Sequence, residues 1–366
     1  MTTPSTMTTT RGFGCLPFLL AAACISQHPH PAAPAPAPGT PRAPLAASGL
    51  PVPPSNGIPR PSGPARNLSV LDWAGFRAAV SFTFDDSQPS HIEHYAELQA
   101  AGVPMTFYIN GGRGGAPAFD GTWTQAVKDG HEIGNHTYHH CHADLTGCLS
   151  GKKPASAAEE IDTNSAYITQ HTPQSAVWTM ASPFGDNGWN APAQASLFIN
   201  RGVVSGTIAP RDDSDPFNLP VHPAVTGEKA ASFDAVTDRA RGGGRWLIFL
   251  FHTLMPTSAN WYAPVAIGDV TASMAHARAL GDVWVDTVVA VGAYWRAQKV
   301  LASIQPVVAG DVTTWTWALP PHFPAGRYLR VRVDGGTLKQ GGAPLAWSDH
   351  GYYEVALDAG SLMLSP

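Results

Sequence analysis

The chain has 366 residues, of which 44% are hydrophobic and 13% charged, and its formal net charge is -5. This length is enough for one large domain and a small accessory one, with a sizeable buried core. The weak negative charge gives no electrostatic footprint for nucleic acid or for an anionic membrane surface, so a neutral partner fits better.

The first 24 residues have the pattern of an export signal. Arg11 precedes an apolar stretch at 15–20, and three alanines stand before Cys24. Small residues before a cysteine resemble a bacterial lipobox, although Ala21 stands where leucine is commoner, so lipid anchoring at Cys24 and plain secretion both stay open. Either route predicts an extracytoplasmic protein that is secreted or held to a membrane through that lipid alone.

Residues 25–66 are dominated by proline and alanine, with glycine and serine toward the end. Proline has no backbone donor and favours an extended, polyproline-type chain. We expect a linker without secondary structure that holds the folded part away from a membrane or wall.

Between residues 67 and 300, short apolar runs alternate with helical patterns, which is typical of parallel strand–helix units. A helix is predicted at 89–101, because Pro89 stands at its start and Gly102 just beyond its end. Seven units favour a distorted, incomplete (β/α) barrel over an open doubly wound sheet. The predicted strands are 79–84, 104–109, 131–134, 176–180, 202–207, 246–251 and 282–285.

Two adjacent carboxylates, Asp85 and Asp86, follow the first of these strands. In a barrel, the carboxyl ends of the strands face the active site. There, one acid can bind a metal ion while the other takes a proton, and the charge of the metal keeps both ionised. By themselves they fit equally well an Asp86 that caps the next helix and an Asp85 in a solvated turn.

Two histidines supply the rest of a metal site. His136 and His140 are four residues apart, so on a helical turn both imidazoles project from one face, while His139 points elsewhere. Alone, such a pair is more often structural, but Asp86 adds a third ligand. One carboxylate and two imidazoles leave coordination positions open for substrate and water, as a catalytic metal site requires.

The two cysteines beyond the signal, Cys141 and Cys148, are separated by a turn-like stretch. An oxidising compartment would permit a disulfide between them. The alternative is a thiolate metal site, which lacks a second cysteine pair to complete it.

A further ionisable residue, His252, ends the apolar strand at 246–251. A histidine at this edge can act as a general acid. Alone it is more often a hydrogen-bonded structural residue, but the neighbouring carboxylates and imidazoles favour the catalytic interpretation.

After residue 301 the pattern changes. Alternating runs at 315–317, 328–333 and 352–357 predict antiparallel strands with glycine-rich turns between them. We expect 301–366 to form a small all-β domain that depends on the barrel for part of its stability, because it is small for an independent sandwich. Its aromatic residues could bind glycan, but simple packing is favoured.

The motifs at 83–86 and 136–140 and the strand that ends at His252 resemble those of the polysaccharide deacetylases of carbohydrate esterase family four, which contain the NodB homology domain. The similarity spans about residues 68–298 and keeps the order of the motifs. It implies a distorted (β/α) barrel.

The resemblance also implies roles for the residues already singled out. A divalent ion, usually zinc, would be bound by Asp86, His136 and His140, with Asp85 as the general base and His252 as the general acid. The reaction implied is metal-assisted hydrolysis of an acetyl group.

Further positions resemble the family's substrate pocket. The backbone N–H of Phe184 would hold the tetrahedral oxyanion, and Pro183 lies beside it in the same motif. Leu250 and Trp284 resemble apolar residues around the acetyl methyl group, although both fit a plain core equally well.

Two positions depart from the family pattern. The family has an arginine that pairs with the general base, but Ala181 stands there in this chain, so that Asp85 loses charge stabilisation unless Arg201 or Arg211 replaces it. The acidic motif expected to orient His252 is blurred. Its place is taken by a run that contains Asp212, Asp213 and Asp215, for which a solvated loop is the favoured interpretation.

The resulting hypothesis is a metal-dependent hydrolase that removes N-acetyl groups from an extracellular polymer of N-acetylglucosamine, such as chitin oligomers or peptidoglycan. Two alternatives stay open. One is an esterase for acetyl xylan or another O-acetyl substrate, because specificity lies in the loops. The other is a catalytically impaired glycan-binding homologue, which the alanine at 181 would support.

Overall fold

The computed structural model describes residues 45–112, 121–149, 152–259 and 261–366. The predicted signal segment, Cys24 and the first part of the predicted linker lie outside these residues. All of the described residues belong to one compact unit. Within the described residues, no helix is both long and apolar enough to cross a membrane.

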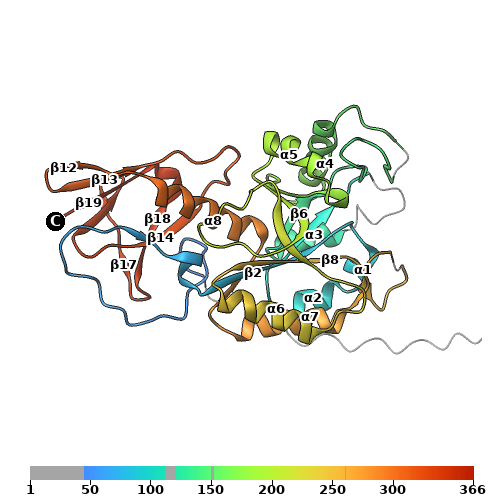
Figure 1. Ribbon diagram of the computed structural model, residues 1–366, viewed down its shortest axis with the longest axis horizontal. Coiled ribbons are helices and arrows are strands. Elements are labelled where there is room, and N and C mark those ends of the chain that lie inside the picture. The colour runs from blue at the N-terminus through green and yellow to red at the C-terminus, as the bar shows by residue number, and fades with distance from the viewer. Residues whose placement is uncertain (1–44, 113–120, 150–151, 260) are drawn as a thin grey trace, which may run out of the picture. The chain divides into compact units, whose positions relative to one another are not determined.

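Seven parallel strands close a barrel, as the alternating sequence pattern predicts (Figure 1). The ring closes because the last strand pairs along almost the whole length of the first. In ring order the strands are β2 (Ala78–Phe84), β3 (Thr106–Ile109), β4 (Glu132–Asn135), β5 (Thr179–Ala181), β6 (Ile199–Ser205), β7 (Leu219–Pro223) and β8 (Trp246–Phe251).

The distortion of the barrel lies between β2 and β3. An eighth parallel strand, β11 (Val283–Val285), pairs with the first half of β2, whereas β3 pairs only with Thr83 and Phe84 at its end. The other edge of β2 is occupied by β8. β11 therefore occupies the edge of β2 that faces β3, near the start of the strand, and is not one of the seven strands of the ring.

Strand β7 is absent from the sequence-based prediction, which has β11 as its seventh strand. Pro220 and Pro223 lie within β7, and proline usually argues against a central strand because it cannot donate a ladder hydrogen bond. The predicted helix 89–101 is also divided in two, because the backbone at His94 departs from helical geometry.

Helices cover the outside of the barrel. Alternate residues of β2, among them Phe82 and Phe84, face these helices in one large apolar cluster, while Ser81 and Thr83 face inward. The helices are α1 (Pro89–Glu93), α2 (Tyr95–Ala100), α3 (Gly121–Lys128), α4 (Ala157–His171), α5 (Asn190–Ser196), α6 (Ala230–Gly242), α7 (Ile267–Ala279) and α8 (Val288–Ser303).

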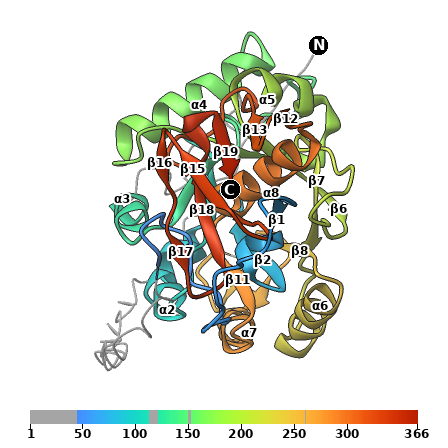
Figure 2. The same cartoon turned by 90° about the vertical axis from the view of Figure 1, so that its left-hand side faces the viewer.

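The C-terminal part is all-β, as predicted, and consists of two sheets (Figure 2). One contains β1 (Ser69–Val70), β14 (Tyr328–Arg332), β18 (Tyr352–Ala356) and β17 (Trp347–Ser348). The other contains β12 (Val307–Ala309), β13 (Val312–Thr316), β19 (Ser361–Ser365), β15 (Thr337–Gln340) and β16 (Ala343–Pro344). Trp315, Trp317 and Tyr353 are buried between the sheets, so these aromatic residues serve packing.

The second half of the predicted linker is not a free tether. Residues 45–66 run along the C-terminal sheets, where Ile58 N–H bonds to the carbonyl of Asp349 and Gly63 N–H to that of Asp334. β1, which follows this segment, pairs with β14. A proline-rich chain is already extended, so its remaining amides and carbonyls can pair with a strand edge. The linker therefore ends near residue 45 rather than at 66.

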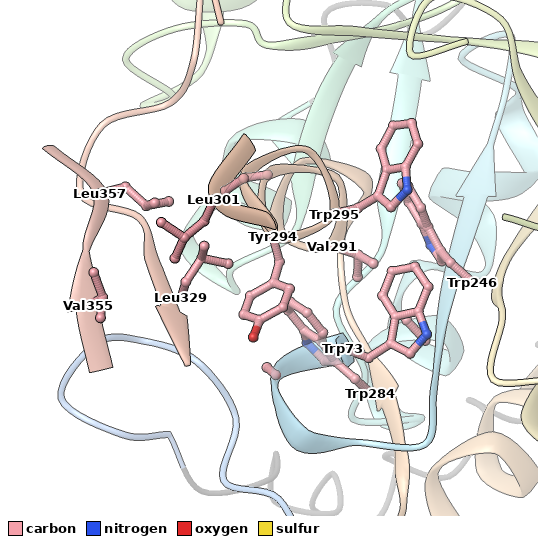
Figure 3. Close-up of a cluster of buried hydrophobic side chains, with 14 of the residues drawn as sticks. Trp73, Trp246, Trp284, Val291, Tyr294, Trp295, Leu301, Leu329, Val355 and Leu357 are labelled. Carbon is pink, nitrogen blue, oxygen red and sulfur yellow. The ribbon is translucent and has the colours of Figure 1, made fainter. Parts of the chain in front are cut away.

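One apolar core joins the barrel to the C-terminal sheets through α8 (Figure 3). Trp295 and Val291 of this helix pack with Trp246 of β8, and Leu301 packs in the same cluster as Leu329 of β14. Gly292 allows the close approach, because a Cβ there would lie 2.2 Å from Ile199. The small β domain is stabilised through this shared core.

A fully buried arginine, Arg330, ties the same parts together. Its guanidinium donates to the carbonyls of Pro51 and Ala74 at 2.7 and 2.9 Å and pairs with Glu354 at 3.0 Å. The four groups come from the proline-rich segment, the turn before β2 and two strands of the β domain.

We predict that Arg330→Met lowers the free energy of unfolding by about 3 kcal/mol, because it leaves Glu354 without its charged partner and two carbonyl groups without their donor. Urea unfolding followed by circular dichroism measures this. Arg60→Met is the matched control, since exposed Arg60 makes a single hydrogen bond within the described part of the chain, to Gly336. An equal and small effect of the two substitutions would contradict the role given to Arg330.

Candidate active site

The carboxyl edge of the barrel brings together the ionisable residues that the sequence singled out. Asp85 and Asp86 directly follow β2, His136 follows β4, and His252 follows β8. His140 comes from the loop after β4. One ligand atom from each of Asp86, His136 and His140 lies within 4.8 Å of the others.

The geometry of these three residues fits a shared cation. Asp86 Oδ1 lies 3.1 Å from Nε2 of His136 and 3.0 Å from Nε2 of His140. Two ligands of one ion at about 2.1 Å and roughly 90 to 110° lie about 3.0 to 3.4 Å apart, which matches these separations.

The tautomer of His136 strengthens this assignment. Its Nδ1–H donates to the carbonyl of Ala181 at 2.8 Å, so a neutral ring presents the lone pair of Nε2 to the Asp86 carboxylate. Two lone pairs at this distance repel unless a positive charge lies between them. Nitrogen and carboxylate ligands in this number suit zinc, and a carbonyl behind the imidazole is the usual support of a metal-binding histidine.

The electrostatics agree with an ionised Asp86. Burial alone would raise the pKa of Asp86, but in the metal-free protein the hydrogen bonds and charges of protonated His136 and His140 outweigh it and hold the pKa well below its ordinary value. Gln88 donates to the second oxygen, Oδ2, at 3.3 Å. Asp86 therefore remains a carboxylate across the working range of pH.

The backbone around the ligands is strained. Asp86, Ser87, Thr137, His140 and Phe184 all have φ between 49° and 75°, in the left-handed region that is unfavourable for residues other than glycine. Strain of this kind persists where the surroundings fix the backbone, and it gathers at functional sites.

Buried amide side chains fix the strained loops. Asn110 donates to the carbonyl of His136, and its own N–H bonds to the hydroxyl of Ser87. The side chain of Asn135 accepts from the N–H of Thr137 at 2.7 Å and from Asn164 at 3.1 Å. Both ligand loops are thus held by one network beneath the site.

The arginine that the general base requires is present on a neighbouring strand. Nη2 of Arg201 in β6 donates to Oδ1 of Asp85, and both side chains are almost fully buried. Arg201 is the direct cross-strand neighbour of Ala181 in β5. Of the two candidates, Arg201 takes this place, while Arg211 pairs with Asp72. The second oxygen of Asp85 faces His136 Nε2, at 3.9 Å.

The guanidinium of Arg201 also rests on the ring of Tyr108, 5.0 Å from its centroid. That ring occupies the space above Gly134, where a Cβ would lie 2.3 Å from it. A glycine at 134 is therefore needed for the aromatic ring that supports Arg201.

His252 lies at the same edge, but among the described residues no acidic group hydrogen-bonds to its buried Nδ1. Asp212 bonds to the N–H groups of Ala209 and Ser214, and Asp215 to that of Phe217, so each serves its own loop. Burial lowers the pKa of His252, while the charges of the nearby carboxylates act in the opposite direction.

Behind this strand, the fully buried His91 donates from Nε2 to the carbonyl of His252 at 2.7 Å. This bond fixes the end of β8. Burial also lowers the pKa of His91 to about 4, so its ring stays neutral at ordinary pH.

Phe184 lies beside the metal ligands. Its ring is edge-on to His140 at 4.7 Å and stacked on His142 at 3.9 Å. Pro183 begins the short helix η2 (Pro183–Gly185), which directly follows β5. The predicted disulfide between Cys141 and Cys148 is formed and closes the loop that follows His140.

The two apolar pocket residues differ in position. Leu250 precedes His252 by two residues on β8, so it lies on the same face of the strand, with 2% exposed. Trp284 pairs with Ala79 near the start of β2, about 20 Å along the strand from Asp85, and packs against Tyr294. The prediction for Trp284 is wrong, because β11 lies at the start of β2, away from the carboxyl edge of the barrel.

A comparison with protein families identifies this site. Residues 76–197 match the family model for polysaccharide deacetylase, and this range contains Asp85, Asp86, His136, His140 and Phe184. The chain carries a polysaccharide deacetylase domain. It is a hydrolase domain, and its motifs resemble those of the NodB type in carbohydrate esterase family four.

Solved structures of low sequence identity are similar to the deacetylase domain. A protein from Mycobacterium smegmatis assigned to the polysaccharide deacetylases is 16% identical over 65% of this chain and 96% of its own, with a TM-score of 0.44. The peptidoglycan deacetylase PdaC from Bacillus subtilis is 18% identical over 59% of this chain and 90% of its own, with a TM-score of 0.37. The Xyl-CE4 domain of a multidomain xylanase from the hindgut metagenome of Trinervitermes trinervoides is 14% identical over 58% of this chain and 89% of its own, with a TM-score of 0.39.

Sequence reasoning missed the residues that support the site of the deacetylase domain. Gln88, Asn110, Asn135 and His91 act through hydrogen bonds between distant segments, and none belongs to a recognisable spacing. The available signal was a set of polar residues directly after apolar strands, where parallel strands end together.

We predict that Arg201→Met lowers kcat/KM at least about 100-fold, because Asp85 loses the cation that fixes and stabilises its charge. Arg201→Lys restores only part, since an ammonium group lacks the planar fork. In the double variant Arg201→Ala and Ala181→Arg, the charge moves to the adjacent strand and should recover activity over Arg201→Ala alone. Full activity of Arg201→Met, in protein shown to be folded, would contradict this.

We also predict that buried His91 makes the metal-free fold sensitive to acid. Its pKa in the folded protein, about 4, lies below the ordinary 6.5, so the unfolded chain binds more protons between these values. The contribution of neutral His91 to the stability of the fold is therefore complete above pH 6.5 and is lost as the pH falls toward 4. From pH 7 to 4.5, urea unfolding should lose roughly 2 to 3 kcal/mol more in the unsubstituted protein than in His91→Gln. Equal losses would refute this.

Proposed function

We propose that this deacetylase removes N-acetyl groups from an extracellular polymer of N-acetylglucosamine, such as chitin oligomers or peptidoglycan, in a reaction that requires a divalent ion, with zinc preferred. The observation behind the proposal is the position of Asp85. It lies next to the three ligand residues, and Arg201 holds one of its oxygens while the other faces them.

The chemistry of each residue follows from this geometry. Asp85 accepts a proton from the attacking water, since its free oxygen is directed at the site and its bound oxygen cannot rotate away. His252, at the end of β8, donates a proton to the departing amine. Bound at Asp86, His136 and His140, a divalent ion would polarise the acetyl carbonyl and lower the pKa of water.

The surroundings of Phe184 support an oxyanion site on its backbone. The residue has a left-handed backbone conformation within η2, and its ring is held between His140 and His142. This contact fixes the peptide next to the ligand set, where the charge of a tetrahedral intermediate would develop.

The site favours an active enzyme over an impaired glycan-binding homologue. The alanine at 181 was the main argument for loss of activity, and Arg201 supplies the missing cation to Asp85 from the next strand. All five residues assigned to metal binding and proton transfer lie at the same edge of the barrel.

An extracytoplasmic location belongs to the same proposal. The sequence has an export-type N-terminus, with secretion or a lipid at Cys24 as the route. The disulfide between Cys141 and Cys148 supports it, because such bonds persist in oxidising compartments.

We predict that Asp85→Asn abolishes turnover while the bound zinc stays nearly unchanged, because Asp85 is a base and not a ligand. His136→Ala should lose both zinc and activity, since it removes one of three ligands. Metal analysis after dialysis and acetate release from acetylated chitooligosaccharides measure the two effects. Equal loss of zinc in the two variants would contradict the division of roles.

The substrate is tested with the same acetate assay on acetylated chitooligosaccharides, peptidoglycan and acetyl xylan, with metal-stripped and zinc-restored protein. The proposal expects zinc-dependent acetate release from a polymer of N-acetylglucosamine. Release from acetyl xylan alone would replace it with an O-acetyl esterase. No release from any substrate, with or without zinc, would favour the glycan-binding homologue.

A further inference from the structure

The histidine assigned as general acid lacks the support that a catalytic imidazole usually has. Among the described residues, Nδ1 of His252 is buried and has no hydrogen-bond partner. The χ2 torsion of histidine is broad and roughly two-fold, and a half-turn of the ring exchanges Nδ1 with Cδ2 and Nε2 with Cε1. Something other than a hydrogen bond must therefore select one orientation.

The ring of Tyr262 is in position to do this. Its centroid lies 4.7 Å from that of His252, and the two planes meet at 83°. This edge-to-face arrangement is the favoured one for aromatic rings. The side chain of Tyr262 is 64% exposed, so it contributes little to the core and leaves its contact with His252 as its main structural role.

The backbone that presents Tyr262 is held by the hydroxyl group of Thr253. This oxygen accepts the N–H groups of Trp261 and Tyr262, both at 3.1 Å, and donates to Oε1 of Gln88 at 2.6 Å. The N–H of Thr253 bonds to the carbonyl of Tyr262 at 3.2 Å. The position of Tyr262 is therefore fixed relative to the residue that follows His252.

The pairing of β9 (Leu254–Met255) with β10 (Val265–Ala266) closes the base of this loop. Through Gln88, which also donates to Asp86, the loop is connected to the metal ligands. The orientation of the general acid and that of the ligand set are thus fixed by one chain of hydrogen bonds.

We propose that Tyr262 is a positioning residue for His252, whose ring it orients by aromatic contact in place of the hydrogen bond that an acidic residue would supply. The inference rests on the proposed function, in which His252 protonates the leaving amine. The aromatic ring carries the effect, not the phenolic hydroxyl group.

The role predicts a dependence on the leaving group. An amide nitrogen must be protonated to depart, whereas the phenolate of an aryl acetate leaves without help. Tyr262→Ala should therefore lower kcat for an N-acetylated chitooligosaccharide about tenfold or more with little change in KM, and leave aryl acetate hydrolysis nearly unchanged. His252→Gln should show the same pattern with a larger loss. Tyr262→Phe should behave as the unsubstituted enzyme.

The contact itself can be measured without activity. In metal-free protein, the NMR resonances of the His252 ring, identified by their loss in His252→Gln, should move in Tyr262→Ala and stay in place in Tyr262→Phe. Val204→Ala is the matched control, since Val204 is equally exposed, at 64%, and lies at the same edge of the barrel.

Two results would overturn the inference. One is an equal loss on both substrates in Tyr262→Ala, which would make Tyr262 a wall of the substrate site. The other is an unchanged His252 resonance in that variant. An unsubstituted enzyme that cleaves aryl acetate and no N-acetyl glycan would instead refute the proposed function, and the resonances would still decide whether Tyr262 orients His252.

Discussion

The structure of the active site depends on one carboxylate oxygen held close to two imidazole nitrogens. Oδ1 of Asp86 faces Nε2 of both His136 and His140, an arrangement that requires a proton or a cation between the groups. Bringing these groups together is unfavourable, and the surrounding structure offsets this by fixing the loops that carry them. The ligand loops adopt left-handed backbone conformations, and a buried network that includes Asn110 and Asn135 holds them there. Such a network is expensive to leave unsatisfied, so it maintains the geometry before any ion or substrate arrives.

The identity of the central residues could be predicted from the sequence, because parallel strands end at one edge and each of these residues follows a strand. Their partners could not. Arg201 replaces an arginine expected at position 181, and the two positions are neighbours only through the pairing of β5 with β6. The register between strands does not appear in the linear sequence. For the same reason, the sequence leaves open whether Asp212, Asp213 or Asp215 orients His252, although it favours a solvated loop. The structure uses the first and last of them within their own loop.

The predictions for Trp284 and for residues 45–66 were wrong for the same reason: each residue or segment was placed without knowledge of the strand it pairs with. The resemblance places Trp284 at the acetyl pocket, with a plain core equally open, but β11 pairs only with the start of β2. Residues 45–66 were placed in a free linker because of their prolines, yet an extended chain is what a sheet edge can bind, and this segment is held by Arg330 and by the strands of the β domain. In each case the local conformation was predicted and its partner was not. The C-terminal sheets and α8 then form one core with the barrel, which makes them part of the deacetylase scaffold.

The central claim is that Asp86, His136 and His140 bind one divalent ion. Crystals of the zinc-treated protein, measured above and below the zinc absorption edge, test it most directly. The account predicts one strong anomalous peak at about 2.0 to 2.2 Å from Oδ1 of Asp86 and from Nε2 of both histidines. An anomalous peak elsewhere, or none in fully treated crystals, would contradict it.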